Sequence, residues 1–183
     1  MACAVTALNS QTGDCNNQGG IVRSFGCKLA DITAVTLSSG VISNFTMAST
    51  GLWKAFVYDR DQTAFYNQTG AVNNNVFSVE QAALLKFRGI SQAYVAAANA
   101  AKDCCDMVFI HVLANGTRLV QGIEIDAAAT GGFVGTVNRN TRVIPSINSD
   151  TGANEARMEY SITGLAATMS PTTSLSDSAI AAL

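Results

Sequence analysis

The sequence predicts an all-β fold with one short helix, in which two antiparallel sheets pack together as a sandwich or barrel. About eight segments have the alternating or β-branched pattern of strands, and turn residues separate most of them. Only residues 90–102 have an Ala-rich helical pattern, with Ser91 as its N-cap, so the strand–helix alternation of a parallel sheet is missing. We expect residues 1–183 to form a single domain with a sizeable core.

The clearest hairpin pattern lies in residues 107–125. Two apolar runs there flank Asn115-Gly116. A type I′ turn needs positive φ at both central residues, which Gly adopts freely and Asn tolerates. The pair therefore predicts a tight two-residue turn that sets the register of the flanking strands.

Three further segments predict β-structure in the first third of the chain. Residues 32–37 and 41–47 are rich in β-branched side chains and flank residues 38–40, Ser-Ser-Gly, which predicts a second hairpin. Residues 53–60 follow as a strand that ends in a turn at residues 59–61. Aromatic side chains on both faces of this strand indicate burial on both sides.

Two longer segments alternate between apolar and polar side chains with a period of two, as half-buried strands do. In residues 72–88 the apolar side is interrupted by Gln81, and its other members are Phe77, Val79, Ala83, Leu85 and Phe87. In residues 155–163 the apolar side consists of Ala156, Met158, Tyr160 and Ile162. Each segment predicts a strand with one core face and one polar face.

The remaining segments are less regular. Residues 127–140 are rich in Gly and Ala and predict a loop, whereas residues 141–147 predict an edge strand, because Pro145 cannot donate to a ladder. The two ends, residues 1–20 and 166–183, have little periodic apolar pattern. We expect them to be extended arms that are mobile in the free subunit and become ordered across neighbouring subunits.

The composition favours burial of surface between subunits. Charged residues make up 13% of the chain, about half of the usual ~25%. A surface so poor in charge must be covered by small polar residues or removed from water by neighbouring subunits, and we favour the second. The net charge of −2 and the absence of Lys or Arg runs predict that any contact with DNA is loose.

Nothing in the sequence indicates membrane insertion or secretion. No apolar run reaches the ~18 residues of a membrane helix, and the N-terminus lacks the basic segment of a signal peptide. We therefore expect the five cysteines to be reduced. Their spacing fits no zinc site, so buried thiols are the favoured interpretation.

The sequence predicts no enzymatic activity and no cofactor. It contains no nucleophile elbow, phosphate-binding loop or zinc-protease motif. His111 is the only histidine and lies in an apolar run, so we expect a packed, hydrogen-bonded residue rather than a general base. Two carboxylate pairs, Glu124 with Asp126 and Asp59 with Asp61, could bind a cation such as Ca²⁺, although solvated carboxylates at a strand end and a turn are the favoured interpretation.

The second half of the chain resembles bacteriophage tail-tube proteins. Three stretches carry the resemblance, in this order: MVFIHVLANGTRLVQGIEI, AAATGGFVGT and NSDTGANEARMEYSITGLAA. In that family an apolar strand, an Asn-Gly turn and a strand that ends near a Gly precede a variable loop and a Tyr-bearing strand that leads into a Gly. Here these features are Asn115-Gly116, Gly122, and Tyr160 through Gly164. With the long strand and helix that precede them, the similarity covers residues 30–165.

The resemblance implies a structural virion protein that forms rings, expected to be hexameric, which stack into a hollow tail tube. Such tubes carry a genome, or an effector in the related type VI secretion and contractile injection systems. The implied partners are other copies of the chain, other tail proteins and, transiently, DNA in the lumen. The implied location is the virion tail, after assembly in the host cytoplasm.

The polar strand faces are the candidate lumen-facing or interface residues. They are Ser78, Glu80, Lys86, Arg88, Glu155, Arg157 and Glu159. Low charge suits broad contacts between subunits. A mildly acidic chain also suits a conduit, because acidic or neutral walls make no strong contacts with phosphates.

Two other classes of protein remain open. Another virion component, such as a capsid, head-to-tail adaptor or decoration protein, would share the composition but have fewer ring-closing strands. A monomeric β-sandwich binding module, for example for carbohydrate, would expose aromatic side chains in a groove and bind Ca²⁺.

Overall fold

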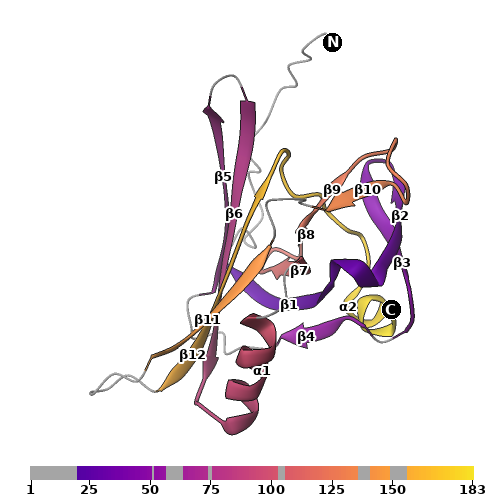
Figure 1. Cartoon of the computed structure of the whole chain (residues 1–183). Helices are drawn as coiled ribbons and strands as arrows, with labels where there is room; N and C mark the ends of the chain where they lie inside the picture. The colour runs from indigo at the N-terminus through magenta and orange to yellow at the C-terminus, as the bar shows by residue number, and fades with distance from the viewer. Residues whose placement is uncertain are drawn as a thin grey trace.

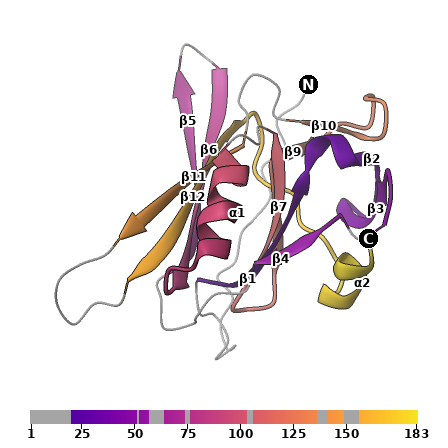
Figure 2. The same cartoon turned by 60° about the horizontal axis from the view of Figure 1, so that its bottom comes forward.

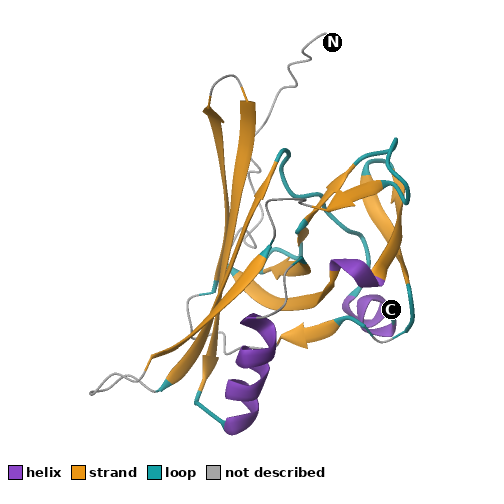
Figure 3. Ribbon diagram, viewed as in Figure 1, coloured by secondary structure: helices purple, strands orange, loops and turns teal. Residues whose placement is uncertain are grey.

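The computed structural model describes residues 20–50, 52–56, 64–73, 76–102, 106–135, 141–148 and 156–183. In these residues the chain is mainly β, and its antiparallel sheets pack on one another without closing into a barrel (Figures 1 and 3). The predicted all-β class with packed antiparallel sheets is therefore confirmed. Of the two predicted arrangements, the chain has the open one.

The described part of the chain contains twelve strands and three helical segments. The strands are β1 (Ile21–Lys28), β2 (Ile32–Ser38), β3 (Val41–Met47), β4 (Lys54–Phe56), β5 (Phe65–Asn73), β6 (Val76–Arg88), β7 (Met107–Leu113), β8 (Arg118–Gln121), β9 (Ile123–Ile125), β10 (Phe133–Gly135), β11 (Arg142–Asn148) and β12 (Arg157–Ala166). The helical segments are the 3-10 helix η1 (Leu29–Asp31), α1 (Gln92–Lys102) and α2 (Asp177–Ala182).

These elements form three layers (Figure 1). The first layer is a four-stranded sheet of order β11-β12-β6-β5, which we call the long sheet. The second is a four-stranded sheet of order β4-β1-β7-β8, the middle sheet. The third layer consists of the hairpins β2–β3 and β9–β10 together with α2.

The central strand β7 of the middle sheet is buried on both faces. One hydrophobic cluster joins Phe109 of β7 to Leu85 and Ile162 of the long sheet. A second cluster joins Ile110 on the opposite face of β7 to the third layer, including Ile180 of α2. This position explains why β7 reads as a nearly continuous apolar run instead of an alternating one.

The alternation predicted for the long sheet is confirmed in its two central strands. From Val79 to Leu85 in β6, and from Met158 to Ala166 in β12, alternate residues are buried and their neighbours in sequence are not; at the two ends of β6, Phe77 is exposed and Phe87 is half-buried. The boundaries of both segments differ from the prediction. The segment predicted as one strand over 72–88 contains the end of β5, residues 72–73, and the whole of β6, which begins at Val76. The strand predicted over 155–163 is β12, which runs from Arg157 to Ala166.

The hairpin predicted at Asn115-Gly116 is present, but its turn is not of type I′. Gly116 has φ 85°, whereas Asn115 is not among the residues with positive φ. The turn has four residues: the amide of Gly116 donates to Leu113 O, and Asn115 Oδ1 accepts from the amide of Thr117. Positive φ at two central residues occurs instead in the predicted second hairpin, in the segment 39–40 between β2 and β3.

The second arm of the 107–125 hairpin is broken at Gly122. Gly122 has φ 99°, and a Cβ atom there would lie 2.4 Å from the carbonyl oxygen of Met107. After this residue the chain leaves the middle sheet as β9, which pairs with β10. Because β10 lies within residues 127–140, the prediction of a loop there is wrong at residues 133–135.

The C-terminal segment belongs to the fold of the subunit, which corrects the prediction of a mobile arm at residues 166–183. Its backbone lies between β3 and β8: the amide of Ile42 donates to Thr172 O, and that of Val120 donates to Pro171 O. Ile180 is fully buried. The prediction rested on the lack of periodic apolar residues in this segment. The segment is held instead by backbone hydrogen bonds and by one buried apolar side chain, Ile180. Of the predicted N-terminal arm, residues 1–19 lie outside the described residues.

The helix is confirmed as α1, and Ser91 Oγ accepts from the amide of Tyr94 as an N-cap does. The edge strand that carries Pro145 is confirmed as β11. The strand predicted over 53–60 appears as β4, at the edge of the middle sheet, where Lys54 and Ala55 are exposed, so burial on both sides is wrong for these residues. Residues 57–63 lie outside the described residues.

Candidate functional site

The candidate polar residues of two separate segments lie on one face of the long sheet. Strands β6 and β12 are antiparallel neighbours, and their register places Lys86 directly opposite Glu159. Because side chains alternate along a strand, these residues point away from the buried face. We call this surface the open face; its predicted and described members are Ser78, Glu80, Lys86, Arg157 and Glu159.

The structure describes two of the predicted residues incompletely or not at all. Glu155 lies outside the described residues. Arg88 has a described backbone, which the register places opposite Arg157, but its side chain is not described.

The open face extends across all four strands. One row of neighbours across it runs through Phe65, Leu84, Ser161 and Ile144. The next runs through Asn67, Ala82, Thr163 and Arg142. The surface is therefore mixed, with small and hydroxyl side chains between larger apolar ones. None of the described elements lies over it in either orientation (Figures 1 and 2).

Charge on the open face is concentrated in one cluster. Glu159 Oε1 lies 3.8 Å from Lys86 Nζ and 2.9 Å from Arg157 Nε. The contact with Arg157 is an ion pair without the alignment of a hydrogen bond. Among the described side chains, the face carries three cations (Lys86, Arg142, Arg157) and two carboxylates (Glu80, Glu159). The surface is thus slightly cationic although the whole chain is acidic, which differs from the expected acidic or neutral wall.

The two outer strands of the long sheet have no further strand partner among the described residues. Strand β5 forms one edge and β11 the other. Such edges present backbone donors and acceptors to another chain. Pro145 interrupts the edge of β11, where it removes one donor.

The hairpin β5–β6 projects beyond the other layers (Figure 1). Three apolar side chains near its end are exposed: Val72 by 66%, Val76 by 57% and Phe77 by 44%. The ring of Phe77 lies over Gly70, where an added Cβ would be 3.0 Å from it, and Met169 lies beside the same glycine. Exposed apolar groups gathered at the end of an element are typical of a contact surface.

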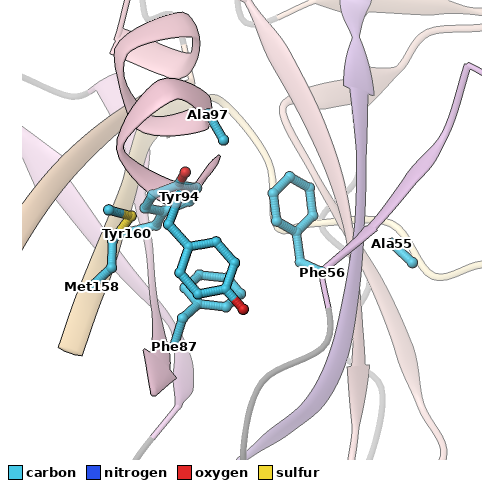
Figure 4. A pocket seen from close by; sticks show the side chains of 7 residues that line it. All are labelled: Ala55, Phe56, Phe87, Tyr94, Ala97, Met158 and Tyr160. Atoms are coloured by element: carbon cyan, nitrogen blue, oxygen red, sulfur yellow. The ribbon is translucent and has the colours of Figure 1, made fainter. Parts of the chain in front are cut away.

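A half-open pocket of about 310 Å³ lies between α1, β4 and the inner face of β6 and β12 (Figure 4). Its lining residues are Ala55, Phe56, Phe87, Tyr94, Ala97, Met158 and Tyr160. The aromatic rings pack at an angle to one another; Phe87 and Tyr160, for example, are 5.3 Å apart. The lining contains no charged or strongly nucleophilic group, and burial raises the pKa of Tyr160. The pocket can accept an apolar group, with tyrosine hydroxyls as its polar atoms.

His111 is a packed, hydrogen-bonded core residue, as predicted. It is fully buried, its Nδ1 lies 2.8 Å from Ser24 Oγ, and its Nε2 lies 2.8 Å from Gln121 Oε1. Burial lowers the pKa of His111 to about 4, although the hydrogen bond with Gln121 opposes the shift. A serine beside a histidine is the arrangement of a nucleophile and its base. Here both side chains lack exposed surface at which a substrate could meet them.

Of the two carboxylate pairs for which cation binding was the alternative interpretation, the structure describes Glu124 and Asp126. Glu124 accepts a hydrogen bond from the amide of Ala167, and Asp126 from that of Ala128. No group of three or more potential metal ligands occurs among the described residues. Asp59 and Asp61 lie outside them, as do all cysteines except Cys27, whose buried thiol has a raised pKa.

Sequence reasoning missed the contributions of β5 and β11 to the open face. Phe65–Asn73 is rich in Asn, Gln and Gly, and its edge position removes the apolar alternation that marks a half-buried strand. Arg142 and Ile144 lie in a strand that was predicted, but only the register of β11 with β12 places them on this face.

None of the helices in the described residues has the length and apolar character needed to cross a membrane. No protein-family model, curated protein or solved structure matches the chain.

Proposed function

We propose that this chain is the subunit of a tail tube, a structural protein that forms rings, expected to be hexameric, stacked into a hollow conduit for DNA. The observation that carries the proposal is the long sheet. It has one face in the core, one mixed polar face without a described cover, and an edge strand on each side. The edges would join neighbouring subunits, and the open face would meet the contents of the tube.

Pairing of β5 of one copy with β11 of the next would continue the sheet from subunit to subunit. A sheet that continues around a ring removes its own edges, as barrels do. The open face would then line the lumen, where polar side chains meet water and DNA in passing. Pro145 limits pairing at one edge, which favours a short ladder at this junction.

The projecting end of the β5–β6 hairpin supplies a surface for ring-to-ring contact. Its exposed side chains, Val72, Val76 and Phe77, would be covered when a second ring stacks on the first. Low charge over the chain agrees with a surface largely covered by neighbours. Further partners in this proposal are other tail proteins at the tube ends, and the location is the virion tail.

Negative-stain microscopy and mass photometry of the purified chain test the proposal. We expect rings or tubes. Ile147 is exposed on the edge strand β11, and Ile147→Lys should leave a folded monomer, because a lysine would replace an apolar side chain that packs beside the neighbouring subunit's strand at this junction. Leu37→Lys is the matched control in the third layer, where the side chain is also exposed, and it should assemble like the parent. Assembly of both variants would contradict the edge-to-edge ring.

The aromatic pocket beside α1 favours a second candidate, a monomeric binding module. Such a protein would remain monomeric at all concentrations in mass photometry. Closed shells would instead indicate a capsid-like protein.

A further inference from the structure

The ion pairs of the open face share one carboxylate. Lys86 and Arg157 both contact Oε1 of Glu159, from the neighbouring strand and from the same strand respectively. The side chain of Lys86 is only 17% exposed, that of Arg157 29% and that of Glu159 14%. Charges that are partly shielded from water are screened less by salt than fully exposed ones. One anion therefore offsets two cations on this surface.

The other carboxylate of the face is placed differently. Glu80 is exposed and lies opposite Leu165 and Thr69, and no ion pair to it is found among the described residues. Arg142 is likewise exposed, opposite Thr163. Among the described side chains, the face thus contains one paired and one unpaired carboxylate, and two paired cations beside one unpaired cation, which allows matched comparisons.

We propose that Glu159 sets the affinity of the open face for polyanions, by holding Lys86 and Arg157 away from the phosphates of passing duplex DNA. This inference rests on the proposed function, in which the open face meets the DNA. Without the charge of Glu159 the described side chains of the face would present three cations against one carboxylate. Each phosphate that a lysine or arginine contacts adds affinity and steepens the dependence on salt.

The test is binding of a short fluorescein-labelled DNA duplex, measured by fluorescence anisotropy between about 50 and 200 mM NaCl. Glu159→Gln and Glu80→Gln change the net charge equally, but only the first releases paired cations. We expect Glu159→Gln to bind roughly tenfold more tightly than the parent at the lowest salt, with a salt slope steeper by about one, the effect of one added phosphate contact. Glu80→Gln should change affinity less. Equal effects of the two variants would overturn the proposal.

A second pair of variants keeps the proposal testable if Glu159→Gln does not fold. Arg157→Gln removes a cation that Glu159 already offsets, whereas Arg142→Gln removes an exposed one. Arg142→Gln should therefore weaken the residual binding of the duplex more than Arg157→Gln does. The opposite order would show that Arg157 is free to contact DNA.

Microscopy of the same samples separates this inference from the tube proposal. Absence of rings in the parent argues against the tube. The order of DNA affinities among the variants does not depend on ring formation, and it alone decides the role of Glu159.

Discussion

Ser24 Oγ lies 2.8 Å from Nδ1 of His111, and both side chains are completely buried between the long sheet and the middle sheet. On the other side of the imidazole, Gln121 Oε1 lies 2.8 Å from Nε2. The ring of Tyr66, from the long sheet, packs against the imidazole at a tilt of 31°, with a centroid separation of 4.8 Å. A neutral imidazole satisfies both contacts, since Nε2–H donates to the amide oxygen and Nδ1 accepts from the hydroxyl.

This geometry predicts that stability falls in mild acid. Burial keeps the pKa of His111 at about 4, below its ordinary 6.5. The unfolded chain therefore binds a proton as the pH falls below 6.5, whereas the folded chain stays neutral until about 4. The folded state keeps its full stability, as far as His111 determines it, above pH 6.5. Between pH 6.5 and 4 the free energy of unfolding falls by up to roughly 3 kcal/mol. Urea unfolding at pH 7.5, 5.5 and 4.5 measures this loss.

His111→Gln is the control for that measurement. It removes the titrating group and keeps a side chain that can hydrogen-bond to Ser24 or Gln121. Its free energy of unfolding will be lower than that of the parent, but it should change less over this pH range. An equal acid dependence in the two proteins would assign the effect to carboxylates.

Local pattern was sufficient to predict the elements that are half-buried or end in a well-defined turn. The alternating β6 and β12, the helix capped by Ser91 and the 107–121 hairpin are all of this kind. Strand β1 was missed because its inner positions include Ser24 and Gly26. A Cβ atom at Gly26 would lie 2.8 Å from the ring of Phe109. The need for glycine at this position therefore comes from the packing of a neighbouring strand and is not visible in the local sequence.

The candidate site was predictable residue by residue but not as a surface. Alternation identified Glu80, Lys86 and Glu159 as polar positions. Their assembly on one face depends on the pairing of β6 with β12, which joins segments far apart in the chain and is not encoded by either alone. The same holds for the C-terminal segment. Its few apolar residues do not by themselves predict burial, because the core cluster that contains Ile180 is built by distant segments of the chain.

Gly122→Ala should destabilise the protein more than Gly116→Ala. Both glycines have positive φ, 99° and 85°, so each substitution carries a backbone cost of about 1–2 kcal/mol. At Gly116 an added Cβ meets nothing within 4 Å, whereas at Gly122 it would be 2.4 Å from a carbonyl oxygen. The change in unfolding free energy, measured in urea, should therefore exceed about 2 kcal/mol only for Gly122. Equal losses of unfolding free energy in the two variants would contradict the close approach of Gly122 to the carbonyl oxygen of Met107.

Ile180→Ala should destabilise the isolated subunit by about 2–4 kcal/mol, because this side chain has no exposed surface. Asp177→Asn, three residues earlier, breaks ion pairs with Arg23 and Arg118 that are partly exposed, and should cost less than about 1 kcal/mol. Thermal melts of monomeric samples measure the loss of stability in each variant, which should be larger for Ile180→Ala than for Asp177→Asn. If Ile180→Ala melted like the parent and only assembly were impaired, the C-terminal segment would be an arm after all.

Gln81→Met should be neutral or stabilising, although it replaces a fully buried residue. Gln81 is the polar exception on the inner face of β6, and neither its amide nitrogen nor its amide oxygen has a hydrogen-bond partner among the described residues. A buried amide without partners costs about 1–3 kcal/mol, whereas the thioether of methionine has a similar volume and no such requirement.

The backbone carbonyl of Gln81 accepts from Gln121 Nε2, and this bond survives the substitution. The link to His111 through Gln121 should persist for the same reason. The measurement is the urea midpoint at pH 7.5, with Gln81→Glu as the control, which introduces a buried charge and should be strongly destabilising. A loss of more than about 1 kcal/mol in Gln81→Met would mean that the amide holds a buried water molecule between the two sheets.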